Sequence, residues 1–118
     1  GFRYGAIAAR HLHAQLHTVS QGGVGLLDGI GWFNEPQYLG MESIWDRVRY
    51  NPQLGPSSVW DFERYDPQIV IVALGQNDSH PVDFMATDYD GCQASHWRSR
   101  YRDFLHALRE KYPRSTII

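Results

Sequence analysis

Residues 67–78 read Pro-Gln-Ile-Val-Ile-Val-Ala-Leu-Gly-Gln-Asn-Asp and are the most informative segment for the fold class. The centre of this segment, 69–74, is a continuous apolar run rich in β-branched residues, without alternating polar side chains. Such a run is typical of a strand buried on both faces, as in a parallel sheet. Pro67 marks the start of the predicted strand and Gly75 marks its end.

Downstream of this strand, the sequence predicts a loop over 75–95, then a helix and a second strand. Six large apolar side chains recur at the spacing of one helix face, and Pro113 ends the predicted helix. The strand that follows covers 115–118. The six residues of the helical stripe are Trp97, Tyr101, Phe104, Leu105, Leu108 and Tyr112.

Upstream, the pattern predicts a helix over 4–13, a short strand over 16–20 and a glycine turn over 21–25. Residues 27–66 are interrupted by prolines and are interpreted as a long crossover that contains one short amphipathic helix near 41–48. The order of helix, strand, crossover, strand, helix and strand predicts parallel strands joined by right-handed crossovers. We therefore expect an α/β fold, a three-layer flavodoxin-like sandwich.

Composition excludes several classes of protein. A chain of 118 residues suits one domain, and a net charge of -2 without a basic run argues against a nucleic-acid partner. The single cysteine, Cys92, excludes an internal disulfide and a cysteine-based zinc site. No run of about 18 apolar residues exists, so no membrane span is predicted. The many aromatic residues suit either a carbohydrate-facing cleft or an aromatic-rich core.

Two turns are candidates for a site, because ligands of parallel sheets bind beyond the carboxyl ends of the strands. One turn is 22–25, after the strand predicted to end near Ser20, and the other is 75–78. Glycine turns offer backbone N–H groups and Asn77 offers a side-chain amide, so the two turns together can form an oxyanion hole. Ordinary strand-to-loop turns are the alternative interpretation.

These motifs also resemble a known family. The segment 74–78 resembles the Gly-x-Asn-Asp block of SGNH (GDSL-like) hydrolases, and 22–26 resembles their upstream glycine block. The helix at 4–10 resembles the one after the nucleophile turn, while 60–62 and 104–113 resemble the surrounding framework. The closest subgroup is carbohydrate esterase family two, which removes acetyl groups from polysaccharides. The resemblance covers nearly the whole chain.

The resemblance implies an esterase that works through an acyl-serine intermediate, without a cofactor. By position, Asn77 donates its side-chain amide to the oxyanion, and Gly23 (or Gly22 if the register shifts by one) donates its backbone N–H. The implied serine would precede Gly1, and the Asp-x-x-His block with the base would follow Ile118. We thus expect an internal part of the domain that is inactive and poorly stable alone. The implied partner is a small-molecule or polysaccharide ester, with acetyl as the expected acyl group, which fits a secreted or periplasmic location.

His80 and Trp97 are candidate substrate-binding residues. His80 follows the Asn77 motif in the same loop and is predicted to line the acyl or sugar pocket, with a plain polar loop residue as the alternative. Trp97 heads the helical stripe, so it either stacks on a sugar ring or packs in the core. The pair Trp32-Phe33 in the crossover is a further candidate for sugar stacking.

Other motifs are interpreted as non-catalytic. Asp103-Phe104-Leu105-His106 matches Asp-x-x-His but lies inside the predicted helix, and Ser20 lacks a Gly-x-Ser-x-Gly elbow. His11 and His13 point to different helix faces, so no metal site is predicted. Two rival functions stay open: a glycan-binding domain without catalysis, and a small-molecule-binding flavodoxin-like domain, whose phosphate turn should be rich in Ser and Thr. The sequence does not set the oligomeric state.

Overall fold

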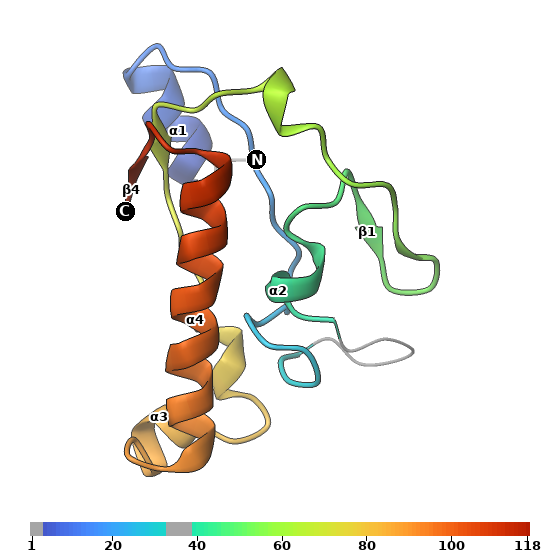
Figure 1. The fold of residues 1–118 in the computed structure, drawn as a ribbon, viewed down its shortest axis with the longest axis vertical. Coiled ribbons are helices and arrows are strands. Elements are labelled where there is room, and N and C mark those ends of the chain that lie inside the picture. The colour runs from blue at the N-terminus through green and yellow to red at the C-terminus, as the bar shows by residue number, and fades with distance from the viewer. Residues whose placement is uncertain (1–3, 33–38) are drawn as a thin grey trace.

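The computed structural model describes residues 4–32 and 39–118. Its longest element is helix α4 (Cys92–Lys111), which runs vertically through Figure 1 with the other segments arranged along it. The remaining elements, in chain order, are α1 (Tyr4–His11), α2 (Met41–Ile44), β1 (Tyr50–Asn51), β2 (Gly55–Pro56), η1 (Phe62–Arg64), β3 (Ile69–Val70), η2 (Asn77–Ser79), α3 (Phe84–Thr87) and β4 (Thr116–Ile117).

The apolar stripe of α4 packs against the core, as the sequence predicts. Within the described residues, the buried cluster joins α4 to the segment 24–27 and to α2, and Leu26 is completely buried at its centre. Burial of this stripe, rather than helix propensity alone, stabilises so long a helix. The buried cluster comprises Val24, Leu26, Leu27, Met41, Ile44, Phe104 and Leu108.

The parallel pairing of the two predicted strands is confirmed. In the register of β3 and β4, Ile69 lies opposite Thr116 and Val70 lies opposite Ile117. The ladder continues one step further, because the Val72 N–H donates to the Ile118 carbonyl at 2.8 Å. The strand is shorter than predicted, however, since regular pairing covers only the start of 69–74.

The prediction that this strand is buried on both faces is wrong for the described residues. Val70, Val72 and Leu74 pack against the core, whereas Ile69 and Ile71 are 54% and 64% exposed. Successive side chains of a strand point to opposite faces, and the described residues cover only one of these faces. The apolar run therefore predicts the strand correctly but not its surroundings in this chain.

The predicted strand at 16–20 is also wrong. This segment is exposed and unassigned, and it has no ladder of hydrogen bonds to another strand among the described residues. An alternating pattern is compatible with a strand, but a strand forms only where the edge of another strand is free to pair with it. The preceding helix is confirmed and ends at His11, two residues earlier than predicted.

The predicted 75–95 loop contains three helical segments. Asn77–Ser79 forms the 3-10 turn η2, and α3 is capped by Asp83, whose side chain accepts from the Ala86 N–H at 3.0 Å. Helix α4 begins at Cys92, five residues before Trp97. Its first turn was not predicted because it lacks the large apolar side chains that mark the rest of the helix. The prediction missed these segments because short capped helices leave no long-range pattern.

The crossover contains more structure than the single helix that the sequence predicts. After α2, strands β1 and β2 form a small antiparallel hairpin that projects from the body in Figure 1. Asp61 then caps η1 by accepting from the Glu63 N–H at 3.1 Å. None of the described helices is long and apolar enough to cross a bilayer. Mixed helices and small sheets with one parallel pair are thus observed, whereas the three-layer flavodoxin-like order stays a prediction.

Candidate functional site

The structure brings the two predicted turns together. We call residues 75–80 the asparagine loop and residues 21–32 the glycine loop. The Asn77 side-chain Nδ2 donates to the Val24 carbonyl at 2.9 Å, which places this amide one residue from Gly23. A side-chain amide has two N–H donors, and the second N–H of Asn77 has no acceptor among the described residues.

Gly23 has a backbone geometry that favours glycine. Its φ is +82°, in the left-handed region, and its carbonyl accepts from the Trp32 N–H at 2.8 Å. Among the described residues, no acceptor engages the Gly23 N–H. The Gly23 carbonyl is therefore held by Trp32, while the Gly23 N–H, which belongs to the preceding peptide, has no acceptor among the described residues. Whether Asn77 and Gly23 face one shared cavity stays a prediction.

The two loops are joined in a different way from the one predicted. Parallel strands were expected to deliver both turns to one sheet edge, but 16–20 forms no strand. Asp78 makes the connection instead. Its carboxylate is 2% exposed and accepts from the Leu26 N–H at 2.9 and 2.8 Å and from the Leu27 N–H at 3.2 Å. Asp78 is therefore a structural hydrogen-bond acceptor that holds the asparagine loop on residues 26 and 27.

His80 lies at the end of the asparagine loop and stacks on Trp32. The ring centroids are 3.7 Å apart and the planes are inclined by 19°. The backbone reinforces this contact, because the Gly31 N–H donates to the His80 carbonyl at 2.9 Å. Trp32 is nonetheless 61% exposed, so an aromatic surface is held beside the Asn77–Gly23 pair. Phe33, its predicted companion, lies outside the described residues.

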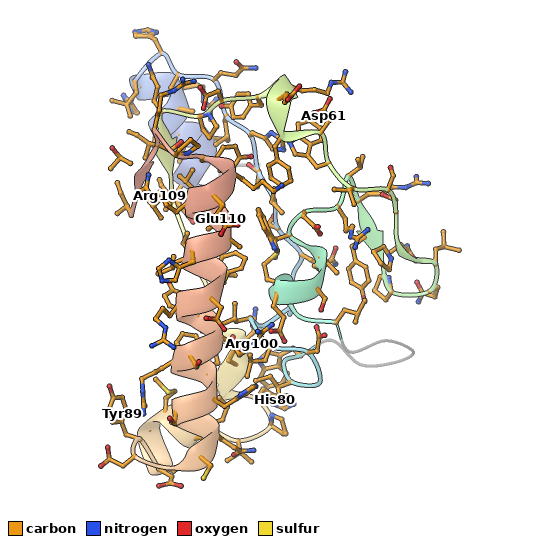
Figure 2. The ribbon with its side chains drawn as sticks, in the orientation of Figure 1. Asp61, His80, Tyr89, Arg100, Arg109 and Glu110 are labelled. Carbon is orange, nitrogen blue, oxygen red and sulfur yellow. The ribbon has the colours of Figure 1, made fainter. Side chains whose placement is uncertain are left out.

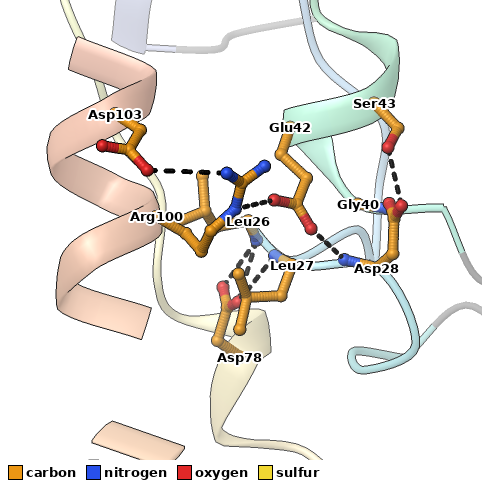
Figure 3. A network of polar contacts seen from close by, with 9 residues as sticks. All are labelled: Leu26, Leu27, Asp28, Gly40, Glu42, Ser43, Asp78, Arg100 and Asp103. Carbon is orange, nitrogen blue, oxygen red and sulfur yellow. Dashed lines mark hydrogen bonds and ion pairs between the residues drawn. The ribbon is translucent and has the colours of Figure 1, made fainter. Parts of the chain in front are cut away.

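A network of carboxylates holds the glycine loop at Asp28, as Figure 3 shows. The Asp28 side chain accepts from the Gly40 N–H and the Ser43 hydroxyl, each at 2.6 Å. Glu42 accepts from the Asp28 N–H at 2.9 Å and pairs with Arg100 of α4 at 2.8 Å. The hydrogen bond to Glu42 raises the pKa of the Arg100 guanidinium above its usual value. Figure 2 shows Arg100 and His80 on the same side of α4.

Trp97 packs against the core, which is one of the two roles that the sequence left open, and stacking on a sugar ring stays a prediction. Its ring stacks on Tyr101, with centroids 4.9 Å apart, and packs on the core as a half-buried residue. It also lines a depression of about 390 Å³ beside the asparagine loop. His80, Asn77 and Gly23 do not line this depression. Its lining consists of Gly75, Gln76, Asp78, Ser79, Asp83, Met85 and Trp97.

The motifs interpreted as non-catalytic lie outside the two loops, although Asp103 of the Asp-x-x-His motif pairs with Arg100 at 3.5 Å. His106 is an exposed residue of α4, and Phe104 beside it belongs to the core. Ser20 is exposed in the unassigned segment before the glycine loop. Within 4–32 and 39–118, no group of three or more His, Cys, Asp or Glu side chains could hold a metal ion.

Sequence reasoning missed the residues that hold the glycine loop in place. Nothing in the spacing of Asp28, Glu42 and Arg100 predicts that they meet, since they come from a loop and two separate helices. The glycine loop folds back on itself: Gly29 and Gly31 both have positive φ, and Gly31 forms a bridge with Val24. The two glycines are the one feature of the sequence that could have predicted this. Two glycines so close to the first block are typical of a tight turn that folds back on itself.

Two solved structures are similar to this chain. One is a family two carbohydrate esterase from Clostridium thermocellum in complex with cellohexaose, with a TM-score of 0.63. The other is an active site mutant of a family two carbohydrate esterase from the same organism, with a TM-score of 0.62. Both are 28% identical to this chain over 97% of its length. No family model matches the chain, and no curated protein does.

The chain spans 30% of the length of each of these two esterases. Together with the parallel β3–β4 pair, the similarity shows a mixed α/β segment that matches part of a carbohydrate-esterase fold. The resemblance drawn from the sequence is thus confirmed at the level of structural similarity to family two carbohydrate esterases.

Proposed function

We propose that this chain supplies the oxyanion hole of an SGNH-type serine esterase that removes an acetyl group from a carbohydrate. In this proposal, the second N–H of the Asn77 amide and the Gly23 N–H stabilise the negative oxygen of the tetrahedral intermediate. A serine and a histidine base outside these 118 residues perform the acyl transfer. No cofactor takes part in this mechanism.

The observation that supports the proposal best is the hydrogen bond from Asn77 to the Val24 carbonyl. It links a Gly-x-Asn-Asp motif to a glycine block 53 positions away in sequence. An oxyanion hole built from both turns would need them to be held together in this way. The similarity to carbohydrate esterases gives independent support to ester hydrolysis on a carbohydrate.

A second part of the proposal is that the 118 residues form one portion of a larger domain. The exposed apolar side of β3, at Ile69 and Ile71, is the kind of surface that a further layer covers. The radius of gyration, 15.2 Å, exceeds the roughly 13.5 Å of a compact domain of this length. Both observations fit a chain that spans 30% of its structural neighbours.

The complete protein is expected to hydrolyse 4-nitrophenyl acetate and an acetylated cello-oligosaccharide, whereas residues 1–118 alone are expected to be inactive and to melt without cooperativity. Release of 4-nitrophenol and acetate, together with thermal melting followed by circular dichroism, measures both properties. Hydrolysis by residues 1–118 alone would contradict the proposed placement of the nucleophile. Tight binding of the oligosaccharide by a complete protein that never hydrolyses it would favour a non-catalytic glycan-binding domain.

The stacked Trp32–His80 pair is the proposed contact for the sugar. Replacing Trp32 with alanine is expected to raise KM for the acetylated oligosaccharide about 3- to 10-fold, the effect of losing one aromatic contact. KM for 4-nitrophenyl acetate, which has no sugar, should change much less.

Tyr89→Ala is the matched control for this variant, because Tyr89 is similarly exposed, at 57%, but lies against Arg98. It should leave both KM values unchanged. An equal change in KM for the two substrates with Trp32→Ala would show that the ring does not contact the sugar.

A further inference from the structure

Asp78 is placed to do more than stabilise the fold. It follows Asn77 directly, and its single carboxylate accepts all three hydrogen bonds that join it to the Leu26 and Leu27 N–H groups. Asn77 itself is joined to the glycine loop by one hydrogen bond. The separation between the Asn77 amide and the glycine loop therefore depends on where Asp78 is anchored.

The fit between this carboxylate and the glycine loop is tight. A Cβ atom built on Gly25 would lie 2.9 Å from the Asp78 carboxyl carbon, closer than real side chains approach. The carboxylate is also buried, at 2% exposure, so no water can replace it without a rearrangement. Without it, two buried N–H groups would be left unpaired, and the loops would move to satisfy them.

We infer that Asp78 is a positioning residue, which sets the distance and angle between the two oxyanion donors by fixing the asparagine loop on the backbone of residues 25–27. This inference rests on the proposed esterase function. Asp78 does not touch the reacting atoms in this account. It acts through Asn77, and a misplacement of about 1 Å in such a donor can cost about 10²-fold in rate.

Glu42 provides a matched comparison. It is also a carboxylate that accepts from an N–H of the glycine loop, at Asp28, and it is also tied to a second element, through Arg100. However, it lies on α2, remote in sequence from the asparagine loop. Loss of the Glu42 carboxylate should weaken the attachment of the glycine loop at Asp28 without moving Asn77.

The test is steady-state kinetics of the complete protein on 4-nitrophenyl acetate. Asp78→Asn, which keeps the shape but loses an acceptor, is expected to lower kcat about 10- to 100-fold with KM within about threefold. Glu42→Gln is expected to keep kcat within about twofold. In the Asn77→Ala background, adding Asp78→Asn should lower kcat by less than about threefold, because residues that act through one another are non-additive.

Two outcomes would overturn the inference. One is a kcat for Asp78→Asn that is unchanged or higher than that of the wild type. The other is a full additional loss in the Asn77→Ala background, which would indicate general damage to the fold. Should Asp78→Asn fail to fold, Gly25→Ala replaces it, since the added Cβ displaces the same carboxylate. This variant is expected to lower kcat with the same dependence on Asn77, and an unchanged kcat overturns the inference.

A measurement without catalysis separates this inference from the proposed function. Amide hydrogen exchange at Leu26 and Leu27 should be at least about tenfold faster in Asp78→Asn, and in Glu42→Gln only Asp28 should exchange faster. A wild-type protein without esterase activity would refute the proposed function alone, and the exchange rates would still decide whether Asp78 anchors the glycine loop. Unchanged exchange at Leu26 and Leu27 would refute the anchoring.

Discussion

Asn77→Ala is expected to lower the turnover number of the complete protein on an acetyl ester by about 10²–10³-fold. The amide would stabilise charge that develops only in the transition state, so kcat should fall while KM changes little. The variant also loses the hydrogen bond to the Val24 carbonyl, which is worth only about 1 kcal/mol of stability. Initial rates and a urea melt on the same preparation separate the two effects.

Asn51→Ala is the matched control for this prediction. Asn51 has the same side chain, and in the β1–β2 turn its oxygen accepts from the Gln53 and Leu54 N–H groups. Its replacement should leave turnover unchanged. Turnover of Asn77→Ala within about threefold of the wild type would remove Asn77 from the oxyanion hole, whatever the control shows.

Leu26→Ala is expected to lower the free energy of unfolding by about 2–5 kcal/mol. Leu26 of the glycine loop is fully buried in the cluster with α2 and α4, so the shorter side chain leaves a cavity at the centre of the core. Such a loss is a large share of a typical margin of about 5–15 kcal/mol. Urea unfolding of the complete protein, followed by tryptophan fluorescence, measures it.

The control for the core prediction is Leu54→Ala. Leu54 is 81% exposed at the tip of the β1–β2 turn, so the same substitution should change the free energy of unfolding by less than about 0.5 kcal/mol. A similar loss at both positions would mean that the segment 24–27 is not the centre of the core. The glycine loop would then lack the rigid support that the proposed oxyanion hole needs.

The sequence predicts those parts of the fold that depend on long periodic patterns. The apolar stripe of α4 follows from its helical period, and the parallel pairing of β3 with β4 follows from the order of strand, helix and strand. The segment 16–20 has a suitable pattern but no partner among the described residues, so pattern alone gave the wrong element. Burial of β3 on one face only is likewise a property of neighbours, which no local pattern specifies.

The sequence predicts that the two turns meet, but not the contacts that join them. Asn77 and Gly23 were expected to converge at one sheet edge, and the structure brings the amide of Asn77 to the residue after Gly23. The connection nevertheless comes from the buried carboxylate of Asp78 and not from two neighbouring strands. Long-range hydrogen bonds between loops depend on the geometry of both partners, and the spacing within one sequence does not encode this geometry.

A structure of the complete protein with a methylphosphonate attached to its nucleophilic serine tests directly whether Asn77 and Gly23 form the oxyanion hole. The phosphonyl oxygen stands in for the oxyanion of the tetrahedral intermediate. We expect this oxygen to lie about 2.7–3.1 Å from both Asn77 Nδ2 and the Gly23 backbone nitrogen, with Gly22 in place of Gly23 if the register is shifted. A phosphonyl oxygen bound by other donors, with the Asn77 amide beyond hydrogen-bond reach, would contradict it.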